Sequence, residues 1–226
     1  MEDRKWKLIL EIVLEILIVS IAFIGSFLAF AYLAHEIAQH DEAAIDERVF
    51  DFFASWDADW FISMMKFFTF FGKPEFLIPF YLLMVAYFFL RKRNRYATSV
   101  LIIGTTSTGL LFVLKGLFKR DRPDLPLVEN ITNYSFPSGH ALLTFILCSI
   151  FIYLIWQGNK KLFWKFFFSF LLLLFAFIVG VSRIILRVHY PTDVLAGFCM
   201  GFAWSILSFW LMNKMTEKKS VLSIHN

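Results

Sequence analysis

The chain has 226 residues, of which 59% are hydrophobic and 30 are phenylalanine, whereas soluble domains contain roughly 45–50% apolar residues. This composition excludes an ordinary soluble domain and indicates a membrane protein. The formal net charge is +4, but no loop that could bind nucleic acid carries a basic stripe interleaved with aromatic residues. A nucleic-acid partner is therefore not expected.

Charged residues are confined to short clusters that leave long uncharged runs between them. A helix needs roughly 17–25 residues to cross the hydrocarbon of a bilayer. Runs near this length occupy residues 16–34, 96–114, 141–159, 166–182 and 194–213. A shorter run, 76–90, is expected to form a helix that begins near Pro74, because proline suits a first helical turn. The sequence predicts an all-α bundle of six transmembrane helices, forming one domain over residues 1–226.

The first run has one feature of a secretory signal peptide, because basic residues precede it and Ala29-Phe30-Ala31 resembles a cleavage site. The hydrophobic part of a signal peptide is only about 7–15 residues long. This run is longer, and Glu11 and Glu15 precede it. We therefore expect a retained first helix.

The lysines and arginines predict the orientation of the bundle. They gather at residues 4–7, 91–95, 160–165 and 214–219, which are alternate ends of the six expected helices. The positive-inside rule makes that face cytoplasmic, so we expect both termini inside the cell and a location in the inner (plasma) membrane.

The opposite face carries an outer loop over residues 34–73. Its first part, 35–59, holds eight carboxylates against Arg48 alone. Its second part, Trp60–Gly72, is apolar but contains Lys66, so we expect an amphipathic, interfacial or re-entrant helix there. From the position and length of this loop, we hypothesise that it covers the functional site and influences the choice of headgroup.

The first of three polar clusters on the outer face contains Lys115 and Arg122-Pro123. The two cations are about two helical turns apart, so they share a face if the helix continues past the membrane edge. Pro123 disfavours helical geometry at the preceding residue, so we expect the helix to end at Arg122. Alternatively they are simply basic residues at a helix end, accompanied by Lys119 and Arg120, whose charged groups reach the membrane surface.

The second cluster is Pro137-Ser138-Gly139-His140, which stands immediately before an uncharged run. A proline at the first helical position leaves the following amides unpaired, and a glycine lets an anion approach the backbone closely. A helix start of this kind predicts an anion site. The alternative is a plain helix start with an interfacial histidine.

The third cluster contains Ser182-Arg183, His189 and Asp193. We expect Pro191 to begin the sixth helix, so that Asp193 hydrogen-bonds His189 and leaves the other ring nitrogen free as a nucleophile. Arg183, at the end of the fifth helix, can grip two phosphate oxygens at once. The alternative is a capping carboxylate beside an interfacial histidine.

Together the clusters match the signature K-x6-RP, PSGH and SR-x5-H-x3-D, and they resemble the type 2 phosphatidic acid phosphatase superfamily at every required position. The matched signature covers residues 115–193. The compact size and long first outer loop are similar to the bacterial phosphatidylglycerophosphate phosphatase B group. One departure is visible at Arg187, where many relatives have a glycine. It could contact a diphosphate or an acidic headgroup, or only reach the membrane surface, which we favour.

The resemblance implies a membrane lipid phosphatase that works through a phosphohistidine on His189. Asp193 would orient the nucleophile, and His140 would protonate the leaving oxygen and then activate water. The phosphate-binding residues would be Lys115, Arg122, Ser138, Gly139 and Arg183. No carboxylate cluster accompanies the signature, so no metal or other cofactor is expected. The expected substrate is phosphatidylglycerophosphate first and undecaprenyl diphosphate second, with phosphatidic acid and lipid A phosphates also possible.

Three other functions have less support from the sequence. Vanadium-dependent haloperoxidases have the same anion pocket, but they are soluble. A non-catalytic lipid transporter of the same fold is the third class, although no catalytic position is lost. His35-Glu36 and His40 suggest a zinc site, yet the histidines are five residues apart and do not share a helical face.

Overall fold

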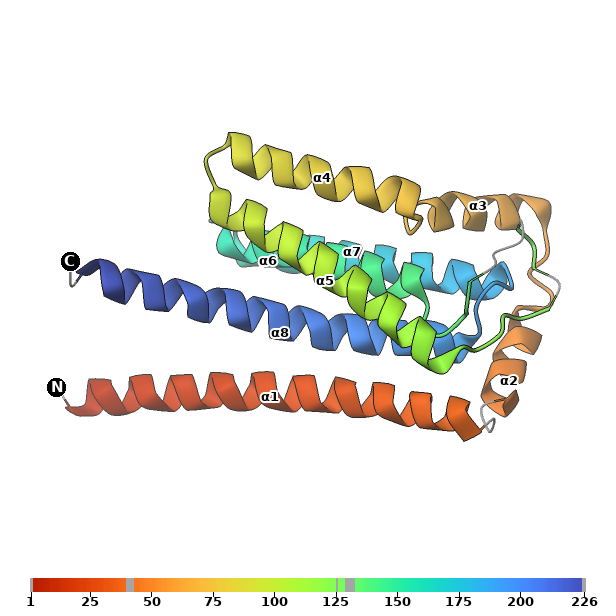
Figure 1. The fold of residues 1–226 in the computed structure, drawn as a ribbon, viewed down its shortest axis with the longest axis horizontal. Coiled ribbons are helices and arrows are strands. Elements are labelled where there is room, and N and C mark those ends of the chain that lie inside the picture. The colour runs from red at the N-terminus through yellow and green to blue at the C-terminus, as the bar shows by residue number, and fades with distance from the viewer. Residues whose placement is uncertain (1, 40–42, 125, 129–132, 225–226) are drawn as a thin grey trace.

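The computed structural model describes residues 2–39, 43–124, 126–128 and 133–224, and these form helices joined by loops, with no strand among them (Figure 1). The helices are α1 (Glu2–Gln39), α2 (Ala43–Phe53), α3 (Asp59–Phe70), α4 (Pro74–Leu90), α5 (Asn94–Phe118), α6 (Gly139–Gln157), α7 (Leu162–Ile185) and α8 (Pro191–Ile224). Over these residues, six helical segments are long and apolar enough to cross a membrane. The all-helical fold with six membrane helices is therefore confirmed.

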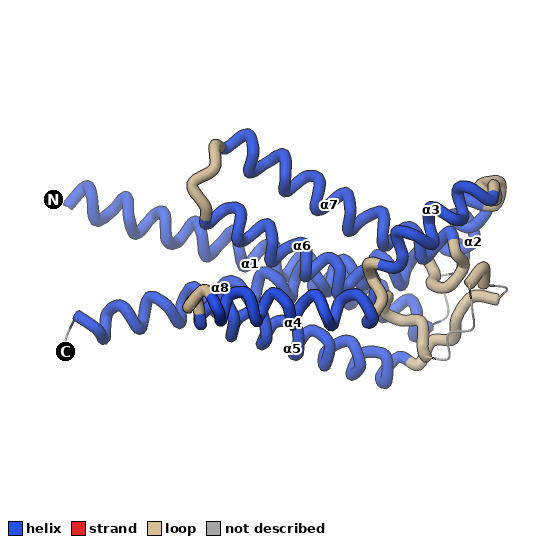
Figure 2. Tube along the Cα trace, turned by 90° about the horizontal axis from the view of Figure 1, so that it is seen from above, coloured by secondary structure: helices blue, strands red, loops and turns tan. Residues whose placement is uncertain are grey.

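The long helices run side by side, and both termini lie at one end of the bundle (Figure 1). The α4–α5 and α6–α7 turns lie at that same end, so the basic residues of 91–95 and 160–165 gather there. At the opposite end lie α2, α3 and the loop after α5 (Figure 2). The polar clusters of the sequence all fall at this second end, which we call the site end.

The segment expected to lie at the interface forms α3. It precedes α4 along almost the same line, separated by the short turn at residues 71–73, and it packs against α7 (Figure 1). Pro74 begins α4 as predicted. The place of α3 relative to the membrane surface stays a prediction.

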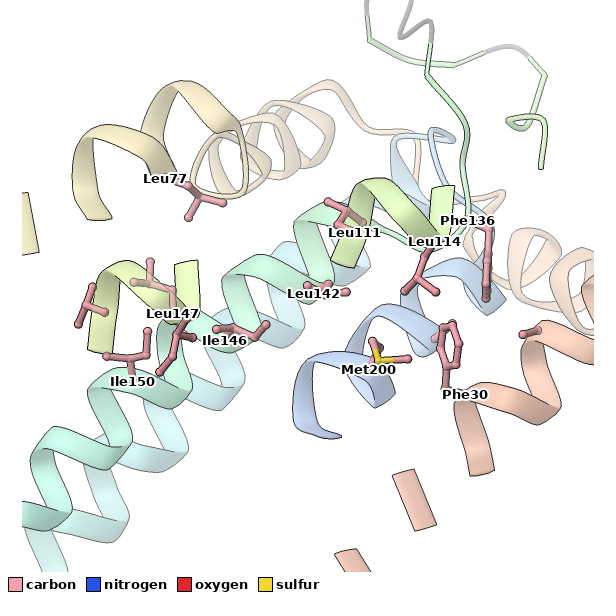
Figure 3. Close-up of a cluster of buried hydrophobic side chains, with 14 of the residues drawn as sticks. Phe30, Leu77, Leu111, Leu114, Phe136, Leu142, Ile146, Leu147, Ile150 and Met200 are labelled. Atoms are coloured by element: carbon pink, nitrogen blue, oxygen red, sulfur yellow. The ribbon is translucent and has the colours of Figure 1, made fainter. Parts of the chain in front are cut away.

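The core surrounds α6, which packs against α7 on one side and α8 on the other. Figure 3 shows buried side chains of α5 and α6 lying together, and Phe30 of α1 beside Met200 of α8. Gly197 brings α8 against the start of α6, because a Cβ there would lie 2.7 Å from the carbonyl oxygen of Ser138. This close contact joins the second polar cluster to the third. The buried residues of this hydrophobic core include Phe30, Leu111, Leu114, Leu142, Ile146, Leu147, Ile150 and Met200.

Candidate active site

A cavity of about 1010 Å³ opens at the site end and extends between α4 and α5. Six of the eight predicted site residues line it: Lys115, Arg122, Gly139, His140, Arg183 and His189. The other two, Ser138 and Asp193, are completely buried beside it. The structure thus brings all three clusters of the sequence to one place.

The two cations of the first cluster do not lie on one continuous helix, because a turn separates them. The helix α5 ends at Phe118, and Lys119 takes a left-handed conformation with φ of 47° while its N–H bonds to the carbonyl of Lys115. The prediction that the helix ends at Arg122 was wrong, because this left-handed cap ends it four residues earlier, at Phe118. Arg122 therefore reaches the cavity from the following loop, where it hydrogen-bonds the carbonyl oxygens of Asn133 and Val188.

The second cluster differs from the expected helix start by two residues. Ser138 is the N-cap of α6, with its hydroxyl accepting from the N–H of Ala141 at 3.5 Å, and Pro137 lies before the cap. Pro137 is therefore not the first helical residue, because the serine side chain already satisfies an orphan amide of the first turn. The Ser138 N–H bonds to the carbonyl of Asp193, 3.0 Å away. Gly139 remains at the cavity wall.

The third cluster has the predicted order, with Pro191 as the first residue of α8. His189 Nδ1 lies 3.4 Å from Asp193 Oδ2, and the Tyr190 N–H donates to the same oxygen at 2.9 Å. The other ring nitrogen, Nε2, lies 3.4 Å from a guanidinium nitrogen of Arg122. Since Nδ1 faces the carboxylate, Nε2 is the nitrogen presented to the cations of the cavity.

Burial lowers the pKa of the His189 imidazole well below its ordinary value of about 6.5, and the nearby cations lower it further. A neutral imidazole is the form that can attack phosphorus. The surroundings of His189 therefore keep it in the nucleophilic state without a separate base.

A buried polar network lies behind His189, and the sequence analysis missed it. Arg120 donates to Asp193 Oδ1 and to Asp46 Oδ2, both at 2.7 Å, and its guanidinium lies 3.9 Å from the centre of the Tyr190 ring. Asp46 also accepts from the backbone N–H and the hydroxyl of Thr192, each at 2.9 Å. The carboxylate of α2 thus caps the first turn of α8 and fixes the residue that holds the histidine.

The last turn of α3 and the turn that follows it contact two further site residues. The Arg183 guanidinium donates to the Thr69 hydroxyl at 2.6 Å, and both side chains are buried. Gly72 lies against the His140 ring, so that a Cβ at Gly72 would lie 2.4 Å from Cδ2 of the imidazole. Neither Thr69 nor Gly72 carried a sequence signal, because their partners are far away along the chain.

The cations in the cavity wall are not neutralised by carboxylates. Among the described residues, no ion pair joins Lys115, Arg122 or Arg183 to an aspartate or glutamate. Lys115 instead donates to the carbonyl oxygens of Tyr134 and Ser135. Two nitrogens, His140 Nε2 and Arg183 Nε, are buried with no hydrogen-bond partner. Unpartnered buried donors beside unneutralised cations make a site for a multiply charged anion.

The rest of the cavity is mostly apolar and lies between α4 and α5. Its lining there includes Leu82 and Val85 from α4 and Leu101, Leu111 and Phe112 from α5. A ligand with a phosphate among the cations can therefore extend an apolar chain between these two helices.

Arg187 is the position where the sequence departs from many relatives. Its φ is 52°, in the left-handed region that glycine adopts without strain. Its side chain is exposed, and it does not belong to the cavity wall. A headgroup contact through Arg187 therefore gains no support.

Of the features that suggested a metal, His40 lies outside the described residues. Within the described part of the chain, no group of three histidine, cysteine, aspartate or glutamate side chains is placed to hold an ion. The chemistry of the cavity wall is that of an anion site.

The fold and the site define a membrane-embedded phosphate-binding protein of the PAP2 type. The family model of the PAP2 superfamily matches residues 58–217, which is most of the chain. The chain belongs to the PAP2 superfamily, and the family expected from the signature is confirmed.

Individual relatives are similar to this chain over most of their length. Phosphatidylglycerophosphatase B of Bacillus subtilis is 28% identical over 201 residues, covering 86% of this chain and 95% of the relative. The crystal structure of a transmembrane PAP2 type phosphatidylglycerolphosphate phosphatase from Bacillus subtilis superposes with a TM-score of 0.76 at 30% identity, covering 88% of this chain and 97% of that one. Aquifex aeolicus LpxE shares the fold, with a TM-score of 0.58 at 23% identity over 72% of this chain and 93% of that one.

A shorter match joins the chain to Escherichia coli YbjG, whose name proposes an undecaprenyl-diphosphatase. It is 34% identical over 95 residues, which is 38% of this chain and 41% of the relative.

Proposed function

We propose that this protein hydrolyses the terminal phosphate of a membrane lipid through a phosphohistidine intermediate. The observation that carries the proposal is the position of His189, with Asp193 at Nδ1 and the cationic cavity at Nε2. An imidazole oriented by a carboxylate and facing unneutralised cations has the arrangement of a nucleophile poised at a phosphate.

In the first step, His189 Nε2 attacks phosphorus while Asp193 stabilises the positive charge that develops on the ring. Lys115, Arg122 and Arg183 neutralise the equatorial oxygens of the phosphoryl group, and the Gly139 amide at the start of α6 donates to one of them. Ser138 caps that helix and fixes the amide. Lys115 and Arg183 are buried, so little water screens their charges at the phosphate.

His140 is the acid and the base of the two steps. It protonates the leaving lipid oxygen when the phosphohistidine forms, and in its neutral form it then activates the water that hydrolyses the intermediate. The Nε2 of His140 supports this assignment, because His140 lines the cavity and this buried nitrogen has no hydrogen-bond partner in the protein. None of these steps requires a metal ion.

The substrate we favour is phosphatidylglycerophosphate. Its phosphate would lie among the cations and its acyl chains would extend between α4 and α5, where the cavity is apolar. The Bacillus subtilis matches in sequence and in structure support this choice, since each covers nearly the whole length of the matched chain and each name carries that activity. Undecaprenyl diphosphate is the second candidate, favoured by the local match to YbjG.

We further infer that the chain lies in the plasma membrane with the site end facing outward. The basic turns at 91–95 and 160–165 lie at the same end as both termini (Figure 1). By the positive-inside rule that end is cytoplasmic.

The test measures phosphate release by purified protein in detergent from phosphatidylglycerophosphate, undecaprenyl diphosphate, phosphatidic acid and a soluble phosphate ester. His189→Ala is expected to lower turnover about 10⁴-fold or more, because it removes the nucleophile. Lys160→Ala, at the opposite end of the bundle, serves as the control and should retain wild-type turnover. Release by His189→Ala at the wild-type rate would refute the proposal.

A further inference from the structure

Two lysines line the cavity without belonging to the phosphate-binding set. Lys66 is on α3, and Lys73 immediately precedes α4. Both side chains are exposed, and no described residue is hydrogen-bonded or ion-paired with either. Glu75 lines the same wall but forms no ion pair with them. The wall therefore holds two cations and one carboxylate beyond the catalytic set.

Lys73 lies on the side of the site from which the lipid leaves. Its chain neighbour Gly72 touches the His140 ring, and in the proposed function His140 protonates the leaving oxygen. In-line displacement places that oxygen opposite the attacking nitrogen of His189. The leaving group therefore passes His140 and the turn at residues 71–73 before it enters the apolar part of the cavity.

The chemistry of the leaving group differs among lipid phosphates. When phosphatidylglycerophosphate loses its terminal phosphate, the leaving group still carries a phosphodiester. When a polyprenyl diphosphate is hydrolysed, the leaving group is a lipid monophosphate. Phosphatidic acid releases uncharged diacylglycerol. A cation on the leaving side can therefore distinguish lipids with two phosphates from lipids with one.

We propose that Lys73, assisted by Lys66, binds the second phosphate of the substrate and selects lipids that carry two phosphates. This inference rests on the proposed function, since it uses the direction of the leaving group. Lysine suits the task because its ammonium group is a point charge on a flexible stem and can follow either a phosphodiester or a monophosphate.

The experiment compares Lys73→Gln and Lys66→Gln with wild type on phosphatidylglycerophosphate, undecaprenyl diphosphate and phosphatidic acid, all in the same detergent. Lys73→Gln should lower kcat/KM about tenfold for both two-phosphate lipids and by less than twofold for phosphatidic acid. Lys66→Gln should show the same pattern more weakly. Lys73→Arg should recover most of the loss, because it restores the charge.

Lys119→Gln is the matched control, since Lys119 is an exposed lysine at the same end that does not line the cavity. This variant should leave kcat/KM unchanged for all three substrates. An equal loss on phosphatidic acid, or no loss on the two-phosphate lipids, would overturn the selectivity. A failure of the proposed function is separable, because then the wild-type protein would release no phosphate from any lipid or would not need His189.

Discussion

Arg120 and Arg122 are two residues apart, yet they serve opposite sides of His189. Arg120 lies behind the histidine and pairs with two buried carboxylates, Asp46 and Asp193. Arg122 lies in front, where it bonds to carbonyl oxygens and faces the ring nitrogen that is presented to the cavity. Behind the nucleophile the arginine is neutralised and held by carboxylates, whereas in front of it the arginine has no carboxylate partner and can bind an anion.

The two arginines thus have different roles, one in stability and one in catalysis, which cannot be distinguished from a basic cluster in the sequence alone. A buried ion pair is costly to break, because removing one partner leaves an uncompensated charge. A cation with no carboxylate partner contributes less to the folded state but can stabilise a transition state strongly. We therefore expect stability and activity to respond differently on the two sides.

The largest difference is expected between Arg122→Gln and Arg120→Gln. Arg122→Gln should lower kcat about 10²–10³-fold, because it removes a donor aimed at the phosphoryl oxygens. Arg120→Gln should destabilise the protein by about 3–5 kcal/mol, because it leaves two buried carboxylates short of a partner. Turnover and the apparent melting temperature in detergent are measured on both variants. Equal melting temperatures for the two would contradict the division of roles.

The contact between Gly72 and His140 gives the next effect. Gly72→Ala would place a Cβ 2.4 Å from the imidazole, so the ring must move, and a misplaced acid is expected to lower turnover about 10²-fold. Gly109→Ala is the control, since nothing lies within 4 Å of a Cβ at that helical position. The loss should be smaller for a soluble ester with a good leaving group, which needs less protonation. A uniform loss on all substrates would argue for general disruption of the fold.

The lowered pKa of His189 predicts the pH dependence. Because the folded protein holds the ring neutral below its ordinary pKa of about 6.5, the acid limb of kcat/KM should fall below pH 6.5. Stability has the same direction: the unfolded chain binds this proton more readily, so stability contributed by this group is lost as the pH falls below about 6.5. The phosphate of the substrate is titrated separately by ³¹P NMR. An acid limb at or above pH 6.5 that the substrate does not explain would contradict the assignment.

The smallest effect is expected at Arg187. Its φ of 52° is unfavourable for a side chain with a Cβ, so Arg187→Gly should raise stability by up to about 1 kcal/mol. Turnover on phosphatidylglycerophosphate should stay within twofold, because the side chain lies outside the cavity wall. A large loss of turnover in this variant would instead assign Arg187 to the headgroup.

The sequence predicted the parts of the site that depend on local order. Lys115, His140 and His189 lie near helix ends whose caps and prolines are readable, and the uncharged runs predicted the six long helices. The exact first and last residues of the helices were harder to predict. The left-handed turn at Lys119 and the cap at Ser138 each moved a boundary, because one backbone angle or one side-chain hydrogen bond decided it.

The support behind His189 could not be predicted in this way. Asp46 is one of eight carboxylates in an acidic segment, and 74 residues separate it from Arg120. Only the packing of α2 across the start of α8 selects it from the other seven. The same holds for Thr69, whose partner Arg183 is 114 residues away.

The most direct test of the account is to trap the intermediate. In His140→Ala, a soluble ester with a good leaving group should still phosphorylate the protein, whereas hydrolysis of the intermediate should be slow because no base activates water. A rapid quench at alkaline pH, followed by peptide mapping, should find a base-stable, acid-labile phosphoryl group on His189. Phosphate on a different residue would contradict the account, as would turnover in this variant with no phosphorylated protein at any time.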